Sequence, residues 1–295
     1  MTPLLSWIFV VLLTFLQEAH GLTSFPDNAV VVTEAHPVTL TCDSATPGDV
    51  TWRFVQHGEV MEVQLGYERS LIVNYEGIPQ LGEYSCWSGE TKLWSAYLVL
   101  DAEESPSDSM LNCLAKSYNC VFNCHWNSAR YTAVRLGLGK DCAEGSKNCS
   151  WVTSSSQHPG QGFRFELSHS LTPYMEETTM IEVTAEAMIK YIFHRTTKRF
   201  YLRDIIKPDS PQIVKCQEVG HQLNVIIEPA SSWSTPHSYF KLEHEIEYVS
   251  RDNGEKRSSR SHLIPMEISK LRVRSRDSLW LSDWSRWTPW TNVNL

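Results

Sequence analysis

The sequence has little positive charge, and after its first residues it has no apolar run long enough to cross a membrane. Its 34 Asp and Glu residues outnumber its 26 Lys and Arg residues, for a formal net charge of −8. Nucleic-acid binders need a basic face for phosphate contacts, so this charge argues against that class. A membrane span needs about 18 uninterrupted apolar residues, and residues 290–295 form no hydrophobic tail for a lipid anchor. We expect no nucleic-acid partner and no membrane anchor.

Enzyme motifs are also missing. The sequence contains no His-Glu-x-x-His, no Gly-x-Ser-x-Gly, no phosphate loop and no cysteine with active-site flanks. His244 stands between Glu243 and Glu245 on a strand that we expect to be exposed, without the spacing of metal ligands. The sequence therefore predicts no enzyme, no cofactor and no metal site.

The chain opens with a mostly apolar run from Leu4 to Leu16, followed by small residues around Gly21. This pattern predicts a secretory signal peptide over residues 1–21 and a secreted, extracellular protein. The positive region that usually begins a signal peptide is missing apart from the terminal amine, so a buried N-terminal strand is the alternative. The remaining length suits three sandwich domains of about 90 to 100 residues each.

Short alternating segments recur between turn residues along the whole chain. Residues 38–42 alternate apolar side chains with threonines, and residues 181–187 alternate apolar side chains with Glu and Thr. This period of two is typical of strands buried on one face, so we predict an all-β protein of three tandem β-sandwich domains. An acidic stretch at 101–108 and the prolines at 207–211 divide the chain into domains at 22–102, 103–206 and 207–295.

Four residues of the first domain have the spacing of an immunoglobulin sandwich. Cys42 and Cys86 bracket Trp52, and Tyr84 stands two residues before the second cysteine. In that fold the cysteines join opposing sheets, the tryptophan packs on the bridge, and the tyrosine ties down a turn. The fold alone does not define a function.

The second and third domains carry patterns that resemble class I cytokine receptors, whose sandwiches are fibronectin type III-like. Cys113 and Cys124, followed by His125-Trp126, resemble a cysteine pair that joins neighbouring strands. The run 284–288 resembles the Trp-Ser-x-Trp-Ser box, with Thr288 in place of the last serine.

The Trp box predicts a stack of cations on aromatic rings. Arg272 and Arg274 alternate on one strand face, so their guanidinium groups are expected to lie between Trp284 and Trp287. The alternative is that these tryptophans are core residues of the sandwich. In either case they stabilise the domain and do not form a binding site.

The resemblance narrows at residues 200–209 and 233–240. These runs, with the domain order, resemble the receptor-like subunits of the interleukin-12 family of heterodimeric cytokines. The resemblance implies that the elbow between the second and third domains binds a four-helix-bundle alpha chain like that of interleukin-12 or interleukin-23. It implies contacts through Tyr118, Tyr239 and Asp277. Leu279 stands where the family has an aromatic residue, and Trp280 beside it is a candidate substitute.

The same resemblance implies that the first domain engages a cell-surface cytokine receptor beta chain and drives immune signalling. The main alternative is a soluble alpha-type cytokine receptor or decoy, which shares the domain order. An adhesion protein would leave the Trp box unexplained. A subunit should leave the cell bound to a helical chain, whereas the alternatives should leave alone.

Eight cysteines in an exported chain predict a disulfide framework. Beyond the two pairs above, Cys120, Cys142, Cys149 and Cys216 remain as possible disulfide or interchain cysteines. Cys142 and Cys149 are placed to close a short loop beside Asn148, the acceptor of a predicted N-glycan.

The family's third domain carries a cysteine pair of its own, which cannot form here because only Cys216 is present. A basic segment at 251–260 surrounds an Asn-Gly turn. It is interpreted as a solvated hairpin tip in preference to a contact for sulphated glycans.

Overall fold

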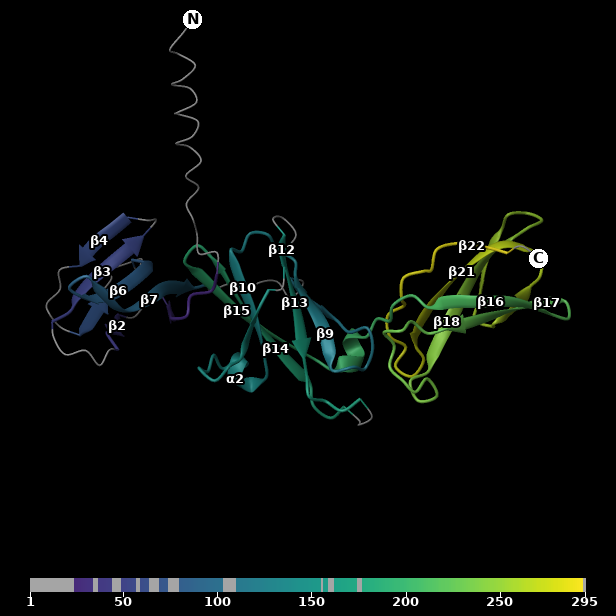
Figure 1. The fold of residues 1–295 in the computed structure, drawn as a ribbon, viewed down its shortest axis with the longest axis horizontal. Coiled ribbons are helices and arrows are strands. Elements are labelled where there is room, and N and C mark those ends of the chain that lie inside the picture. The colour runs from purple at the N-terminus through teal and green to yellow at the C-terminus, as the bar shows by residue number, and fades with distance from the viewer. Residues whose placement is uncertain are drawn as a thin grey trace, which may run out of the picture. The chain divides into compact units, whose positions relative to one another are not determined.

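The structure is a computed structural model. It describes residues 24–33, 37–43, 49–56, 59–63, 69–73, 80–102, 110–154, 156–158, 162–173 and 177–293. The predicted signal peptide and most of the acidic stretch at 101–108 lie outside these residues. The regular secondary structure of the described part is almost entirely strand, with one short α-helix and one 3-10 helix (Figure 1). The prediction of an all-β protein made of tandem sandwiches is confirmed.

The chain divides into two compact units. Unit 1 comprises Met1–Met110, Trp126–Phe163 and Thr184–Thr197, and unit 2 comprises Leu111–His125, Arg164–Val183 and Lys198–Leu295. The predicted middle domain, 103–206, contributes residues to both units, and the predicted domain boundaries stay a prediction.

The immunoglobulin-like part belongs to unit 1. Its strands are β1 (Ala29–Val32), β2 (Val38–Thr41), β3 (Thr51–Gln56), β4 (Glu59–Val63), β5 (Ser70–Val73), β6 (Gly82–Ser88) and β7 (Thr91–Asp101). Strands β2 and β5 form a separate pair, and the disulfide from Cys42 to Cys86 connects that pair to the sheet of β6. Trp52 packs in the same buried cluster, and the Tyr84 hydroxyl donates to the Gln80 carbonyl at 2.9 Å. These contacts have the arrangement that the spacing predicts.

The sheet of the immunoglobulin-like part continues into later residues. Its order is β11-β10-β14-β15-β7-β6-β3-β4, where β10 is Ala133–Leu138, β11 is Trp151–Thr153, β14 is Ile181–Ile189 and β15 is Ile192–Phe200. The link is a short parallel pairing in which Ile192 lies opposite Leu100 and Phe193 opposite Asp101. The short helix α2 (Lys140–Ala143) follows β10, and the disulfide from Cys142 to Cys149 closes the loop after it.

A further sheet has the order β12-β13-β9-β8. Its strands are β8 (Leu111–Leu114), β9 (Val121–Trp126), β12 (Ser156–His158) and β13 (Gly162–Ser168). Cys113 on β8 is joined to Cys124 on β9, so this disulfide links neighbouring strands of one sheet.

The C-terminal part of unit 2 is a two-sheet sandwich that follows the 3-10 helix η1 (Leu202–Ile205). One sheet contains β16 (Gln212–Val219), β17 (Gln222–Glu228) and β20 (Leu263–Pro265). The other contains β18 (Leu242–Ser250), β19 (Lys256–Ser259), β21 (Ile268–Asp277) and β22 (Thr291–Asn292). Leu223 and Val225 of β17 pack against Ile246 of β18 and Val273 of β21 in a common core.

Strand β21 shows how alternation positions the residues of interest. Leu271, Val273, Ser275 and Asp277 are buried, whereas the arginines between them are only half-buried. Because side chains alternate between the faces of a strand, the arginines line the face opposite the core.

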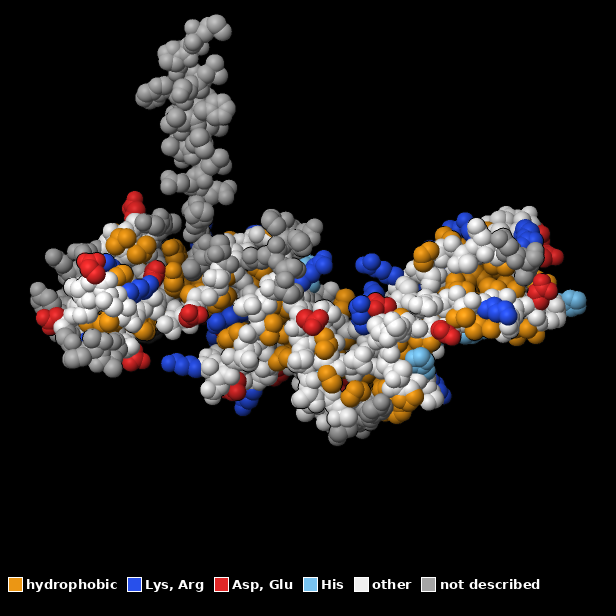
Figure 2. Space-filling view, viewed as in Figure 1, with side chains coloured by type: hydrophobic (Ala, Val, Ile, Leu, Met, Phe, Trp, Pro, Cys, Tyr) orange, Lys and Arg blue, Asp and Glu red, His pale blue; other side chains and the backbone are white. Residues whose placement is uncertain are grey.

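The surface shown in Figure 2 carries acidic and basic side chains interspersed among hydrophobic ones. Within the described residues, no helix has the length and hydrophobicity needed to cross a membrane.

Candidate partner-binding site

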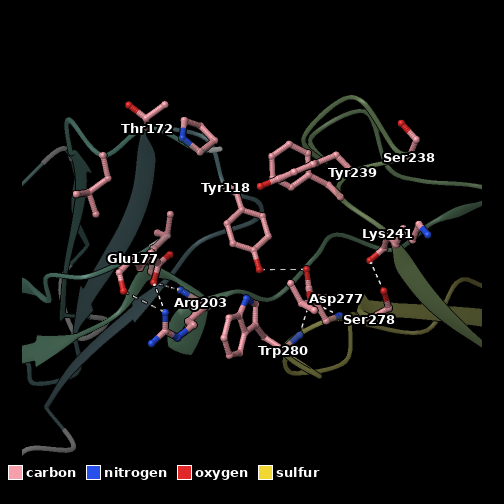
Figure 3. A pocket seen from close by; sticks show the side chains of 15 residues that line it. Tyr118, Thr172, Glu177, Arg203, Ser238, Tyr239, Lys241, Asp277, Ser278 and Trp280 are labelled. Atoms are coloured by element: carbon pink, nitrogen blue, oxygen red, sulfur yellow. Dashed lines mark hydrogen bonds and ion pairs between the residues drawn. The ribbon is translucent and has the colours of Figure 1, made fainter. Parts of the chain in front are cut away.

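A cavity of about 800 Å³ lies within unit 2, and we call it the Tyr118 pocket. It is lined by Tyr118, by residues 171–173 with Glu177, by Leu202 and Arg203 of η1, and by residues 238–241 and 277–280 (Figure 3). The structure therefore brings together the three contact positions implied by the family resemblance, Tyr118, Tyr239 and Asp277. They are far apart in the sequence and come from three different segments.

Tyr118 forms the centre of the pocket. Its hydroxyl donates to the Asp277 carboxylate at 3.1 Å, and its ring stacks on Phe240 with centroids 5.3 Å apart. Its backbone N–H donates to the Ser234 hydroxyl at 3.1 Å. Burial, and then the nearby Asp277 charge, raise the pKa of Tyr118 well above its ordinary value. The phenol is therefore a permanent hydrogen-bond donor to the carboxylate.

Asp277 is 3% exposed and stands at the end of β21. One carboxylate oxygen accepts the backbone N–H groups of Leu279 at 2.8 Å and Trp280 at 2.7 Å, and the other accepts from Tyr118. Its own N–H donates to the Ser282 hydroxyl at 3.0 Å. Aspartate commonly organises turns in this way, through bonds to the backbone two or three residues on. In the described part of the chain Asp277 has no ion-pair partner, so only neutral donors hold its charge.

Arg203 supports the pocket wall, which the sequence analysis did not predict. Its guanidinium group lies 4.0 Å from the Tyr201 ring centroid and 4.5 Å from the Trp280 ring centroid. It also pairs with the Glu177 carboxylate at 3.6 Å. Burial raises the pKa of Glu177, although the neighbouring Arg203 opposes this shift. Residues 200–209 were noticed only as a family run, and no local pattern connects Arg203 with Trp280.

The rim of the pocket carries large side chains that face solvent. Tyr239 is 59% exposed, Leu279 is 76% exposed and Trp280 is 52% exposed. Leu279 and the neighbouring Trp280 both line the pocket, and Trp280 also stacks on Arg203. Exposed large apolar side chains gathered around a pocket are typical of a surface that another protein covers.

The stack predicted from the Trp box lies on the face of β21 opposite the core. Arg272 is 4.7 Å from the Trp287 ring centroid, and Arg274 lies 4.7 Å from Trp284 and 4.5 Å from Trp287. Both tryptophans are half-buried, so they are not fully enclosed core residues.

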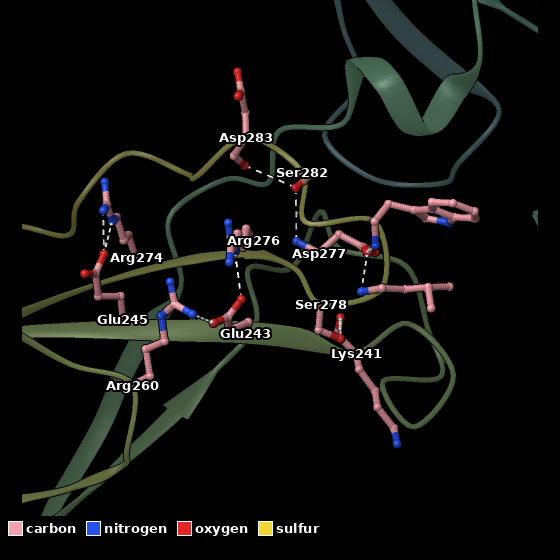
Figure 4. A network of polar contacts seen from close by, with 12 residues as sticks. Lys241, Glu243, Glu245, Arg260, Arg274, Arg276, Asp277, Ser278, Ser282 and Asp283 are labelled. Atoms are coloured by element: carbon pink, nitrogen blue, oxygen red, sulfur yellow. Dashed lines mark hydrogen bonds and ion pairs between the residues drawn. The ribbon is translucent and has the colours of Figure 1, made fainter.

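The stack is longer than the sequence analysis predicted. Arg276 lies 4.5 Å from Trp284, and Arg272 lies 4.6 Å from Trp290. Strands β18 and β21 are antiparallel, and their register places a glutamate of β18 opposite each of these arginines. Figure 4 shows the glutamates that pair with Arg274 and Arg276. The ion pairs are Arg272 with Glu247, Arg274 with Glu245, and Arg276 with Glu243. The continued alternation of arginines was the signal that would have revealed Arg276.

His244 differs from the sequence expectation. It was expected on an exposed strand face, but it is half-buried on β18, and its Nδ1 lies 2.8 Å from the hydroxyl of Ser275 on the neighbouring strand β21. Because β18 pairs with β21 along its whole length, the register places His244 directly opposite Ser275.

The remaining cysteines have different environments. Cys142 and Cys149 are joined and Asn148 beside them is exposed, whereas Cys120 and Cys216 are free. Cys120 is exposed and lies 3.8 Å from the carbonyl of Leu171, which lines the Tyr118 pocket. Cys216 is half-buried, and burial raises the pKa of its thiol. Across the described residues, no cluster of three or more His, Cys, Asp or Glu side chains is arranged to hold a metal ion.

Comparison with known proteins finds relatives that match most of the chain. The family model described as cytokine interleukin-12p40 C-terminus matches residues 108–189. The chain is 28% identical to interleukin-12 subunit beta of Felis catus, with 96% of each chain covered. It is 29% identical to the Macaca mulatta protein of that name and 28% identical to that of Homo sapiens, with 85% of this chain and 84% of each relative covered. The chain is therefore similar over most of its length to interleukin-12 subunit beta, and the relatives that it matches are named as subunits of a cytokine.

Proposed function

We propose that the chain is the secreted, receptor-like subunit of a heterodimeric cytokine, and that its Tyr118 pocket binds a four-helix-bundle alpha chain. The relatives are named as subunits, and a subunit acts together with another chain. The alpha chain resembles that of interleukin-12 or interleukin-23.

The observation that carries the proposal is the combination of an exposed apolar rim with a carboxylate that lacks a cation. Tyr239, Leu279 and Trp280 supply apolar area, and tyrosine adds a polar tip. Asp277 keeps lone pairs beyond those used by its neutral donors. An arginine on the partner satisfies this charge through a charge-assisted hydrogen bond in a partly desolvated site.

The experiment is co-expression with a helical alpha chain, followed by co-purification from the culture medium. The double variant Tyr239→Ala with Leu279→Ala removes two large exposed side chains from the rim. We expect the alpha chain to bind at least tenfold more weakly, because residues of this kind supply most of the binding energy of an interface. Val214→Ala is the matched control, since Val214 is 52% exposed on β16 of the same unit and lies outside the pocket.

Asp277→Ala is a less specific variant. Asp277 accepts three hydrogen bonds that organise the loop after β21, so its removal disturbs the rim as well as the charge. Wild-type binding by the rim double variant would place the interface elsewhere. Secretion of the wild-type chain alone, without the alpha chain, would favour the soluble alpha-type receptor or decoy.

Receptor engagement is the second part of the proposal. We assign it to residues 22–102, where a cell-surface cytokine receptor beta chain binds and immune signalling begins. The support is three exposed apolar side chains. Val60 is 63% exposed and Met61 is 44% exposed on β4, which is an edge strand among the described residues, and Ile72 on β5 is 55% exposed.

Secretion is supported by the three disulfides and by the exposed Asn148 sequon. Disulfides persist in oxidising compartments, and N-glycans are added to exported chains. Electrophoresis of the secreted complex without reducing agent would establish whether a free cysteine links the two chains covalently.

A further inference from the structure

Three consecutive large apolar residues follow Asp277 and Ser278, and we call them the apolar loop: Leu279, Trp280 and Leu281. Their side chains are 76%, 52% and 57% exposed. Single exposed hydrophobic residues are ordinary on protein surfaces, but adjacent ones beside a pocket indicate a contact surface. Leu281 lies just beyond the residues that line the Tyr118 pocket.

Leu281 has an unusual backbone conformation. Its φ is 50°, in the left-handed region that is unfavourable for residues with a Cβ atom and easily adopted by glycine and asparagine. Lys190, with φ 55°, is the other non-glycine residue with positive φ that the structure describes. Lys190 occupies the tight turn between β14 and β15, and such hairpin turns require positive φ. Leu281 instead directly follows the turn at residues 278–280, in the long segment that joins the paired strands β21 and β22.

Anchors on both sides hold Leu281 in this conformation. Before it, the Asp277 carboxylate binds the N–H groups of Leu279 and Trp280, and the Trp280 ring stacks on Arg203. After it, the Ser282 hydroxyl accepts the N–H of Asp277 (Figure 4). Local strain persists where the surroundings determine the backbone in this way, and such strain is concentrated at functional sites.

Neither burial nor turn geometry explains a leucine at position 281. The side chain gains little inside the free chain because it is 57% exposed, and the backbone favours a residue without a branched or bulky side chain. A leucine at this position becomes favourable when another molecule covers its side chain and removes it from water. The occupant must be apolar at this point and must also reach the Asp277 carboxylate, which lacks a cation.

We infer that Leu281 is a specificity-determining residue: with Leu279 and Trp280 it selects helical alpha chains that carry an aliphatic patch beside the cation facing Asp277. This inference rests on the proposed function. It adds a requirement on the partner, because a helix with the cation but with polar neighbours binds the pocket weakly.

The test compares three variants with wild type in two measurements. These are the denaturant midpoint of the free chain and the dissociation constant for the co-expressed helical alpha chain. Leu281→Asn relieves the left-handed strain and removes the apolar contact, so we expect a higher midpoint and about tenfold weaker binding, equivalent to about 1.4 kcal/mol. Leu281→Met keeps both the apolar contact and the strain. We therefore expect this variant to bind the alpha chain more tightly than Leu281→Asn does, with a denaturant midpoint no higher than that of wild type.

Lys190→Asn is the control for strain. It relieves the same backbone conformation in unit 1, so we expect a higher midpoint with an unchanged dissociation constant. Wild-type affinity in Leu281→Asn would overturn the inference while leaving the proposed function intact. A lower midpoint in Leu281→Asn would also overturn it, because the leucine would then stabilise the free chain. Failure of the wild-type chain to bind any alpha chain would overturn the proposed function, and the inference with it.

Discussion

At the scale of single residues, His244 connects burial with pH. Burial, and then the charge of His262, lower the pKa of His244 from 6.5 to about 4. The two rings meet edge to face with centroids 5.4 Å apart. Between pH 6.5 and pH 4 the unfolded chain therefore binds a proton that the folded chain does not. The stability associated with this residue is present above pH 6.5 and is lost as the pH falls towards 4.

We predict that the free energy of unfolding falls by about 2 kcal/mol between pH 7.5 and pH 4.5 because of His244, a value reduced for partial exposure of the ring. Urea unfolding of wild type and His244→Gln at both pH values checks this. The glutamine variant keeps a group that can bond to Ser275 but cannot titrate, so its stability should depend less on pH. Equal pH dependence in the two proteins would contradict the assignment.

At the scale of elements, β21 is stabilised on the face opposite the core by stacked cations and rings. Arg274 lies between two tryptophan rings and also pairs with Glu245 on β18. A planar guanidinium group can stack and pair simultaneously, whereas an ammonium group cannot reproduce both contacts. This strand ends at Asp277, so its position determines where the pocket rim begins.

We predict that Arg274→Ala lowers the free energy of unfolding by about 2 kcal/mol, through lost cation–π contacts and an unpaired Glu245. Arg274→Lys should lower it by about 1 kcal/mol, since the charge remains but the planar stack does not. Arg286→Ala is a matched control, because Arg286 is exposed and has no ion-pair or ring partner among the described residues. Thermal or urea unfolding measures all three. Equal stability of Arg274→Ala and the control would contradict the proposed role of the stack.

Local patterns in the sequence predicted much of this architecture, and long-range contacts account for what was missed. The spacing of Cys42, Trp52, Tyr84 and Cys86 predicted the immunoglobulin-like core, because that arrangement depends on offsets within one domain. The pairing of β7 with β15 joins residues that are about ninety positions apart in the sequence. The alternation of side chains within either strand does not indicate which strand it pairs with.

The candidate site shows the same division. Tyr118, Tyr239 and Asp277 were named through family resemblance, and the structure places all three on one pocket. The positions of Arg203 and Leu281 could not be predicted, because they depend on a stack between η1 and the loop after β21 and on the hydrogen bonds of Asp277.

At the scale of the whole molecule, the two proposed functions use different parts of the chain. Alpha-chain binding is assigned to a pocket of unit 2, and receptor binding is assigned to strands of unit 1. Deleting residues 22–102 is a poor test of this division, because β7 also pairs with β15 and its loss would expose the edge of the remaining sheet. Point substitutions at exposed positions of β4 leave that pairing intact.

We predict that Val60→Lys with Met61→Lys leaves co-purification with the alpha chain unchanged and reduces receptor-dependent signalling in responsive cells at least tenfold. The reason is that a receptor covering this apolar edge would have to desolvate two new charges. Val219→Lys on β16, where the native side chain is 50% exposed, is the control for adding charge elsewhere. If the double variant signalled like wild type, the receptor would have to bind a different surface. If the double variant also failed to co-purify with the alpha chain, the assignment of receptor binding to unit 1 and of alpha-chain binding to unit 2 would be wrong.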